Sequence, residues 1–410
     1  MPWRASGVLE ERARFAVEWE SGDWTMSELC RHYGISRKTG YKILWRWQQQ
    51  GATGLGDHSH APLHHPNQTA EGIQRRVLKL RREHMSWGPR KLRSWLRSHH
   101  PGQKWPAAST IGELLKREGL AHPRKQRRRT PPHTQPFAHA DGSNQVWCVD
   151  FKGWFRTQDG DRIDPFTMTD AYSRYLLRCQ AVAKTDTPAV ISLCEAAFRE
   201  FGLPQAIRSD NGAPFATSAI AGLSRLALYW MRLGITPERI KPGHPEQNGR
   251  HERMHRTLKA ETASPAQANR RRQQQAFDRF RQIYNQQRPH EALGQRPPAD
   301  IYTHSPRCCP ERVPNPEYDS SLQVRSVYPH GQFFWKGQDI FLSKVLAGER
   351  IGLDQIDDRY WCIYYATFPI ASFDAQQLRV SNLHQQQDDG NLEISYNRNS
   401  QIPTASTTTT

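Results

Sequence analysis

The chain has 410 residues, more than a single hydrophobic core accommodates, so we expect several domains. Its 57 lysines and arginines outnumber 40 acidic residues, and the net charge of +17 favours a polyanionic partner. No apolar run approaches the roughly 20 residues that cross a bilayer, and residues 1–20 lack the apolar centre of a signal peptide, so we expect nucleic acid and no membrane as that partner. The seven cysteines are scattered without a C-x-x-C pair, which argues against structural zinc and for a reducing cytoplasm.

Residues 1–50 are expected to form a helix-turn-helix DNA-binding domain. Amphipathic helices are predicted at 11–20 and 26–33, and a third helix at 37–49 would be capped by Ser36. Recognition helices present their first residues to the major groove. The DNA-contact candidates are therefore the polar residues at the start of the third helix: Arg37, Lys38, Tyr41 and Lys42. The alternative is a small helical bundle with a solvated basic face.

A second basic, helical segment follows a linker at 51–69. Residues 70–121 carry apolar residues at helical spacing and are predicted to form a second helix-turn-helix unit, with Arg90 and Lys91 as phosphate ligands. Residues 122–140 form a basic linker that we expect to lie along a DNA backbone as a salt-sensitive contact. Its DNA-binding candidates are Arg127, Arg128 and Arg129.

The composition changes at Gln145, where strand patterns begin. The elements expected in residues 141–305 are strands at 145–155, 162–169, 175–183, 205–209 and 235–241, and helices at 188–201, 219–233 and 266–287. This order predicts an α/β layer architecture that opens with an antiparallel meander. After a Pro-rich linker at 306–322, residues 323–382 read as short strands at the spacing of a small β-barrel. Residues 383–410 are predicted to be a disordered tail.

Three acids stand at the ends or centres of these elements. Asp150 lies in the first strand, Asp210 ends a short buried strand, and Glu252 lies on a later helix. Each acid alone is explained by a turn cap or a salt bridge, but unpaired carboxylates among apolar neighbours are costly. A shared divalent cation would offset that cost, and carboxylate ligands favour Mg²⁺ or Mn²⁺. Two such ions would activate an attacking hydroxyl and stabilise the leaving oxygen of a phosphodiester.

Four segments resemble the retroviral-integrase-like DDE transposases of bacterial insertion sequences. They are VWCVDFKG, IRSDNGAPF, PGHPEQNGRHERMHRTLK and YNQQRPHEAL. The resemblance extends over the whole chain and implies a multidomain α/β protein, in which a ribonuclease-H-like core follows two helix-turn-helix units and precedes a small β-barrel. It also implies binding of terminal inverted repeats, metal-dependent cleavage, and attack of a 3′-hydroxyl on target DNA. The metal ligands, for two Mg²⁺ or Mn²⁺ ions, would be Asp150, Asp210 and Glu252.

The same resemblance implies further roles around the third acid. Arg256 and Lys259 would hold DNA phosphates beside the metals, and Asn248 would help to shape the site. Two DNA ends must be brought together, so we expect a homo-oligomer. Two other functions remain open: a DNA-binding regulator with an inactive core, and a metal-dependent nuclease that cuts without joining.

The third acid has a competitor. Glu246 lies 36 positions after Asp210, and spacing alone would select it. Glu246 falls in the loop HPEQNG, however, whereas the family's acid lies four residues beyond the Asn-Gly element. Glu252 fits that position, and Arg256 and Lys259 follow it at i+4 and i+7 on one helical face. We therefore expect Glu252 to be the third ligand.

Overall fold

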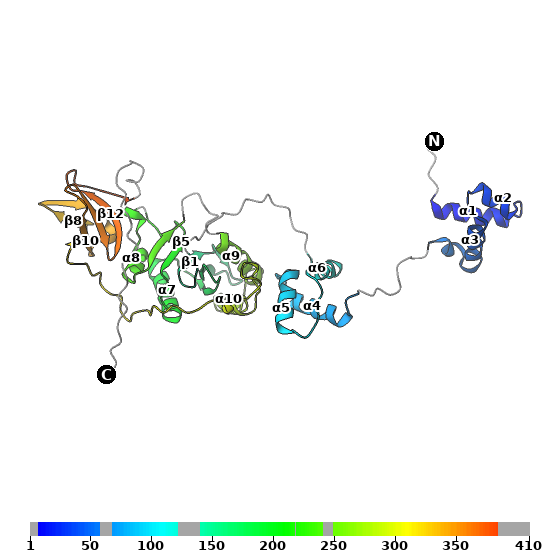
Figure 1. Ribbon diagram of the computed structural model, residues 1–410, viewed down its shortest axis with the longest axis horizontal. Coiled ribbons are helices and arrows are strands. Elements are labelled where there is room, and N and C mark those ends of the chain that lie inside the picture. Colours follow the sequence, from blue (N-terminus) through cyan, green and yellow to red (C-terminus); the bar gives the residue numbers. More distant parts are fainter. Residues whose placement is uncertain (1–6, 58–67, 122–139, 218, 241–248, 384–410) are drawn as a thin grey trace. The chain divides into compact units, whose positions relative to one another are not determined.

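The computed structural model describes most of the chain in two compact units, Met1–Ala70 and Glu71–Thr410 (Figure 1). The described residues are 7–57, 68–121, 140–217, 219–240 and 249–383. Several sequence predictions lie outside these ranges: the contacts of Arg127, Arg128, Arg129 and Asn248, the competitor Glu246, and the tail from 384 onward. None of the described helices is long and apolar enough to cross a membrane.

The first unit contains the three helices expected from the sequence. They are α1 (Val8–Glu20), α2 (Met26–His32) and α3 (Arg37–Gln50). Phe15, Leu29 and Leu44 form the centre of its core. The Ser36 side chain accepts a hydrogen bond from the Thr39 backbone N–H at 3.2 Å, so this residue caps α3 as predicted.

The linker predicted to begin at residue 51 starts later than expected. Residues 51–55 form a short 3₁₀ helix, η1 (Gly51–Leu55), and Leu55 is only 3 % exposed. The Arg12 guanidinium donates to the Leu55 carbonyl at 2.7 Å. Glycine-rich composition suggested a linker, but the buried Leu55 side chain and the Arg12 contact attach this segment to the helices.

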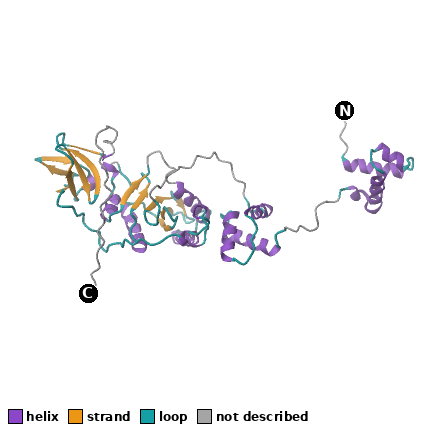
Figure 2. Ribbon diagram, viewed as in Figure 1, coloured by secondary structure: helices purple, strands orange, loops and turns teal. Residues whose placement is uncertain are grey.

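The second unit opens with three helices and continues into strands (Figure 2). The helices are α4 (Glu71–Glu83), α5 (Pro89–His99) and α6 (Ala108–Arg117). Val77, Trp87, Leu92 and Ile111 are fully buried between them. Ile283, from a helix much later in the chain, packs against this cluster, so the three helices are attached to the following core.

The core is a mixed sheet whose strand order is β4-β3-β1-β5-β6, with β2 added to the start of β3. The strands are β1 (Val146–Phe151), β2 (Phe155–Arg156), β3 (Arg162–Asp170), β4 (Leu176–Val182), β5 (Ala206–Ser209) and β6 (Thr236–Arg239). β1, β3 and β4 form an antiparallel meander, whereas β5 and β6 run parallel to β1. This is the ribonuclease-H-like arrangement that the sequence led us to expect.

Helices cover both faces of this sheet. On one face α7 (Thr187–Phe201) and α8 (Arg225–Arg232) pack on Trp147, Val149 and Phe166. On the other, α9 (Gly249–Thr262) and α10 (Arg270–Gln286) pack on Ile163, Leu176 and Cys179. The single helix predicted at 219–233 is divided into η2 (Ile220–Gly222) and α8. Gly222 has a φ of +63°, and Ser224 accepts from the Ala227 N–H to begin a new helix.

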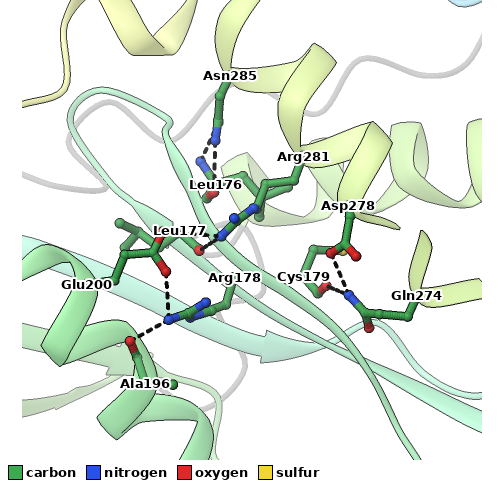
Figure 3. Close-up of polar contacts among 10 residues, drawn as sticks. All are labelled: Leu176, Leu177, Arg178, Cys179, Ala196, Glu200, Gln274, Asp278, Arg281 and Asn285. Atoms are coloured by element: carbon green, nitrogen blue, oxygen red, sulfur yellow. Dashed lines mark hydrogen bonds and ion pairs between the residues drawn. The ribbon is translucent and has the colours of Figure 1, made fainter. Parts of the chain in front are cut away.

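Side chains of α10 satisfy the backbone of the edge strand β4 (Figure 3). Asn285 accepts from the Leu176 N–H at 2.8 Å and donates to the Leu176 carbonyl at 3.0 Å. Arg281 donates to the Leu177 carbonyl at 2.7 Å, and Gln274 donates to the Cys179 carbonyl at 3.0 Å. The polar residues of this glutamine- and arginine-rich helix therefore replace a missing neighbouring strand.

The last part of the chain forms a five-stranded antiparallel sheet and a hairpin. The sheet has the order β13-β12-β11-β10-β7. Its strands are β7 (Gln323–Ser326), β10 (Arg350–Gln355), β11 (Tyr360–Tyr365), β12 (Phe368–Asp374) and β13 (Arg379–Ser381), and the hairpin is β8 (Gln332–Trp335) with β9 (Gln338–Phe341). A bridge between Val327 and Phe333 links sheet and hairpin. Closure into a barrel is not seen among the described strand pairs, and stays a prediction.

Candidate active site

Two of the three predicted acids lie at the carboxyl ends of adjacent parallel strands. The register of β1 and β5 pairs Trp147 with Ile207 and Cys148 with Arg208. The same offset continued by two residues brings Asp150 level with Asp210, and residues level in a parallel pair face the same side. The Gly212 N–H donates to Asp210 Oδ1 at 3.2 Å, which orients this carboxylate. The strand register thus places the two acids level with each other at the ends of neighbouring strands.

The third acid lines a cavity of about 560 Å³ beside this strand end. Its lining residues are Lys152, Glu252, His255, Arg256, Lys259, Ala260 and Ser264. Lys152 follows Asp150 by two residues, so the cavity connects the end of β1 with α9. Neither Asp150 nor Asp210 is among the described lining residues, and the place of Asp210 beside Asp150 rests on the strand register. The structure therefore brings Glu252, Arg256 and Lys259 to one cavity.

Two histidines that the sequence analysis did not select attach α9 to the sheet directly behind Asp150. Thr167 pairs with Asp150 across β1 and β3, and its hydroxyl donates to the Asp150 carbonyl at 3.1 Å. The hydroxyl oxygen of Thr167 lies 2.7 Å from His251 Nε2 and 2.6 Å from His255 Nε2. Thr169 Oγ1 lies 3.0 Å from His251 Nδ1. All these contacts are satisfied when both imidazoles carry their proton on Nε2 and donate to Thr167.

The electrostatic state of this pair favours the neutral form. Burial lowers the pKa of His251 to about 3. Burial also lowers the pKa of His255, and the neighbouring His251 adds to that effect. Both imidazoles are therefore uncharged near pH 7, and they hold α9 in place without a positive charge that would compete with a cation for Asp150.

The residues present fit a hard divalent cation. Asp150, His251 and His255 offer ligand atoms within 4.8 Å of one another. The Thr167 hydroxyl already contacts both imidazoles. We therefore interpret the two histidines as residues that position α9 and not as metal ligands. Asp150, Asp210 and Glu252 would supply the carboxylate oxygens that Mg²⁺ and Mn²⁺ prefer, but among the described residues these three acids do not lie within 4.8 Å of one another as a group, and their role as ligands stays a prediction. The H-x₃-H spacing on one side of α9 is the sequence signal that could have identified the pair.

Replacing Thr167 by valine should destabilise the core. The change keeps the shape but leaves two buried N–H donors and the Asp150 carbonyl without this partner, at a cost of about 2–4 kcal/mol in the free energy of unfolding. Denaturant unfolding of the intact chain measures the difference. The matched control is Thr169→Val, which removes a single histidine contact. Equal stability of the two variants would contradict the network described for Thr167.

The predicted DNA-contact residues of the first unit are all exposed. Arg37, Lys38, Tyr41 and Lys42 lie on the first turns of α3 with their side chains toward solvent. Tyr41 is 58 % exposed although it is aromatic, whereas Leu44 on the other side of α3 is buried. This arrangement leaves the basic start of α3 available to a ligand.

Of the two predicted phosphate ligands of the second helical segment, Arg90 makes an exposed ion pair and Lys91 is partly buried. The Arg90 guanidinium donates to Glu291 Oε1 at 2.6 Å. Burial, followed by the charge of Arg288, lowers the pKa of Lys91 to about 8. Nearby, Arg288 donates to Glu261 at 2.8 Å and to the Ser86 hydroxyl at 2.9 Å. A phosphate role for Arg90 and Lys91 stays a prediction.

Family comparisons match most of the chain. Residues 140–245 and 233–298 match two integrase core domain families, residues 11–62 match a helix-turn-helix domain, and residues 39–115 match a homeodomain-like domain. An uncharacterized 39.2 kDa protein of insertion element IS476 from Xanthomonas euvesicatoria is 26% identical over 249 residues, covering 59% of this chain and 67% of that protein. A 31.7 kDa protein of insertion element IS407 from Burkholderia multivorans is 25% identical over 257 residues, covering 59% and 86%.

The solved structures to which this chain is similar include two structures of viral integrases. The HTLV-2 integrase catalytic core domain in complex with magnesium is 15% identical, covers 40% of this chain and 98% of its own, and has a TM-score of 0.32. The simian T-cell lymphotropic virus intasome in complex with a PP2A regulatory subunit is 17% identical, covers 72% and 94%, and has a TM-score of 0.36.

Proposed function

We propose that this chain, which belongs to the insertion-element transposases with an integrase-like catalytic core, binds the terminal inverted repeats of its element, cleaves the DNA there and transfers the 3′ end to target DNA. The observation that carries the proposal is the register of β1 and β5, which sets Asp150 level with Asp210. The cavity that contains Glu252 and three basic side chains adjoins the same strand end. Carboxylates that can bind metal ions, next to basic side chains that can bind phosphates, suit a metal-dependent reaction on DNA.

Asp150, Asp210 and Glu252 would hold two Mg²⁺ or Mn²⁺ ions, which when bound activate the attacking hydroxyl and stabilise the leaving oxygen. The chain's own cations position the DNA: Lys152, Arg256 and Lys259 line the cavity and bind phosphate oxygens. His251 and His255 keep α9 fixed against β3, so Glu252 and Asp150 keep their relative positions before substrate arrives.

Recognition of the repeats is assigned to the helical segments. The exposed start of α3 enters the major groove. The basic residues Arg127, Arg128 and Arg129 bind phosphates of the DNA backbone. Asn248 precedes α9 and helps to shape the site. Joining requires two element ends, so the active species is a homo-oligomer on DNA.

Strand transfer by the purified full-length protein tests this function. With Mg²⁺, a duplex that carries the terminal repeats flanking the gene and a labelled 3′ end should become covalently joined to a target plasmid. Cleavage without a joined product would identify a nuclease instead. DNA binding without cleavage or joining would identify a regulator with an inactive core.

A further inference from the structure

A second cavity of about 260 Å³ adjoins the first and shares two residues with it. Lys152 and Lys259 line both cavities. Elsewhere the wall of the second cavity is apolar and largely aromatic, with side chains of Trp154, Phe155, Leu258 and Phe277. None of the described residues that line it is acidic. A ligand here would combine an apolar ring with a negative charge near the two lysines.

Trp154 is the most exposed of the aromatic residues in this wall, with 56 % of its surface accessible. The guanidinium carbons of Arg156 and Arg162 lie 5.9 Å and 5.2 Å from its ring centre. Arg162 is held there by Asp164, whose carboxylate accepts from its Nε at 2.9 Å. Arg156 donates to the Gly160 carbonyl at 2.6 Å. The protein thus holds two cations beside the Trp154 indole, which itself lines the cavity, before any ligand binds.

This combination matches the chemistry of a nucleotide. Aromatic rings and guanidinium planes stack on nucleobases, and lysines bind the attached phosphates. A volume of 260 Å³ falls just below the range of about 300–1,000 Å³ typical of pockets for drug-sized ligands, so it suits one ring system rather than a base pair. A base that enters must therefore have left the helical stack.

We propose that this cavity holds an unstacked base of the DNA strand, adjacent to the phosphate positioned in the candidate active site. The inference rests on the proposed function, because it takes the first cavity to be the place of phosphodiester chemistry. Lys152 and Lys259 face both cavities and bind the phosphate between base and reaction centre. Stacking on Trp154 offsets the cost of unstacking the base. Because every base has an aromatic face, this contact tolerates different sequences.

Trp154→Ala and Trp154→Phe in the full-length protein test the site in two ways. In binding measurements without divalent metal, 2-aminopurine is placed in turn at each nucleotide near the cleaved end of a repeat duplex. Wild type and Trp154→Phe should change its fluorescence at one position, and Trp154→Ala should not. In joining assays with Mg²⁺, Trp154→Ala should be about tenfold slower, as expected for the loss of one base–aromatic stack. The matched control is Tyr172→Ala, which removes another exposed aromatic residue beyond the opposite end of β3.

An abasic nucleotide at the identified position supplies the decisive comparison. Wild type and Trp154→Ala should join this DNA at the same rate, since no base remains to stack. The proposal is overturned if Trp154→Ala stays tenfold slower on abasic DNA, or if it equals Tyr172→Ala on intact DNA. A Trp154-dependent fluorescence change in a wild-type protein that joins nothing would support the base site and reject strand transfer. Joining that does not depend on Trp154 would support strand transfer and reject the base site.

Discussion

Replacing Asp150 by asparagine should reduce cleavage and joining by roughly a thousandfold, since a bound metal ion contributes several kcal/mol of charge stabilisation to the transition state. Asp150 lies near the end of β1, level with Asp210, and only 15% of its side chain is exposed. Asparagine has the same shape but carries no charge and offers one ligand oxygen instead of two. Binding of repeat DNA should remain, because the exposed start of α3 is unchanged.

The measurements are joining of labelled ends to a plasmid and retention of the repeat duplex in a gel. Asp186→Asn is the matched control: Asp186 is an exposed aspartate that caps α7, and asparagine caps helices equally well. The control should keep wild-type joining. Wild-type joining by Asp150→Asn would remove Asp150 from the set of metal ligands.

Replacing Glu252 by glutamine should lower joining roughly a hundredfold to a thousandfold, the range seen when one preorganised electrostatic contact is lost from an active site. Glu252 is exposed on α9 and lines the cavity with Lys152 and Arg256, so the change should not disturb the fold. The companion variant Glu246→Gln should keep wild-type joining. Loss of joining in Glu246→Gln with full activity in Glu252→Gln would assign the third ligand to Glu246, the acid that the spacing from Asp210 selects.

Local patterns were sufficient for the architecture of the core. The run VWCVDF identified β1, the apolar residues Phe277, Phe280 and Tyr284 identified the buried side of α10, and the expected meander is the one formed by β1, β3 and β4. Each of these signals lies within one element, where burial dictates which positions are apolar. The place of Asp210 at the end of a strand followed from the same reading, whereas Asp150, expected at the centre of a strand over 145–155, lies one residue before the end of the shorter β1.

The long-range polar contacts around the candidate site could not be predicted from patterns within single elements. Thr167 meets His251 and His255 only because β3 pairs with β1 in one register and α9 turns one side to it, and these residues are 84 and 88 positions apart. Arg90 and Glu291 are 201 positions apart, so no pattern in the sequence indicated that the exposed Arg90 side chain pairs with an acid. Polar pairs across such distances leave no periodic trace in the sequence.

The side chains that α10 places along β4 limit how copies of the protein can associate. Leu176, Leu177 and Cys179 have carbonyl groups already bonded to Asn285, Arg281 and Gln274 (Figure 3), and the Ala181 N–H donates to Gln274. A strand from a second copy would have to displace these bonds before it could extend the sheet. The opposite edge strand, β6, has four residues and offers little for pairing. The core sheet is therefore protected along β4 against edge-to-edge pairing with another copy.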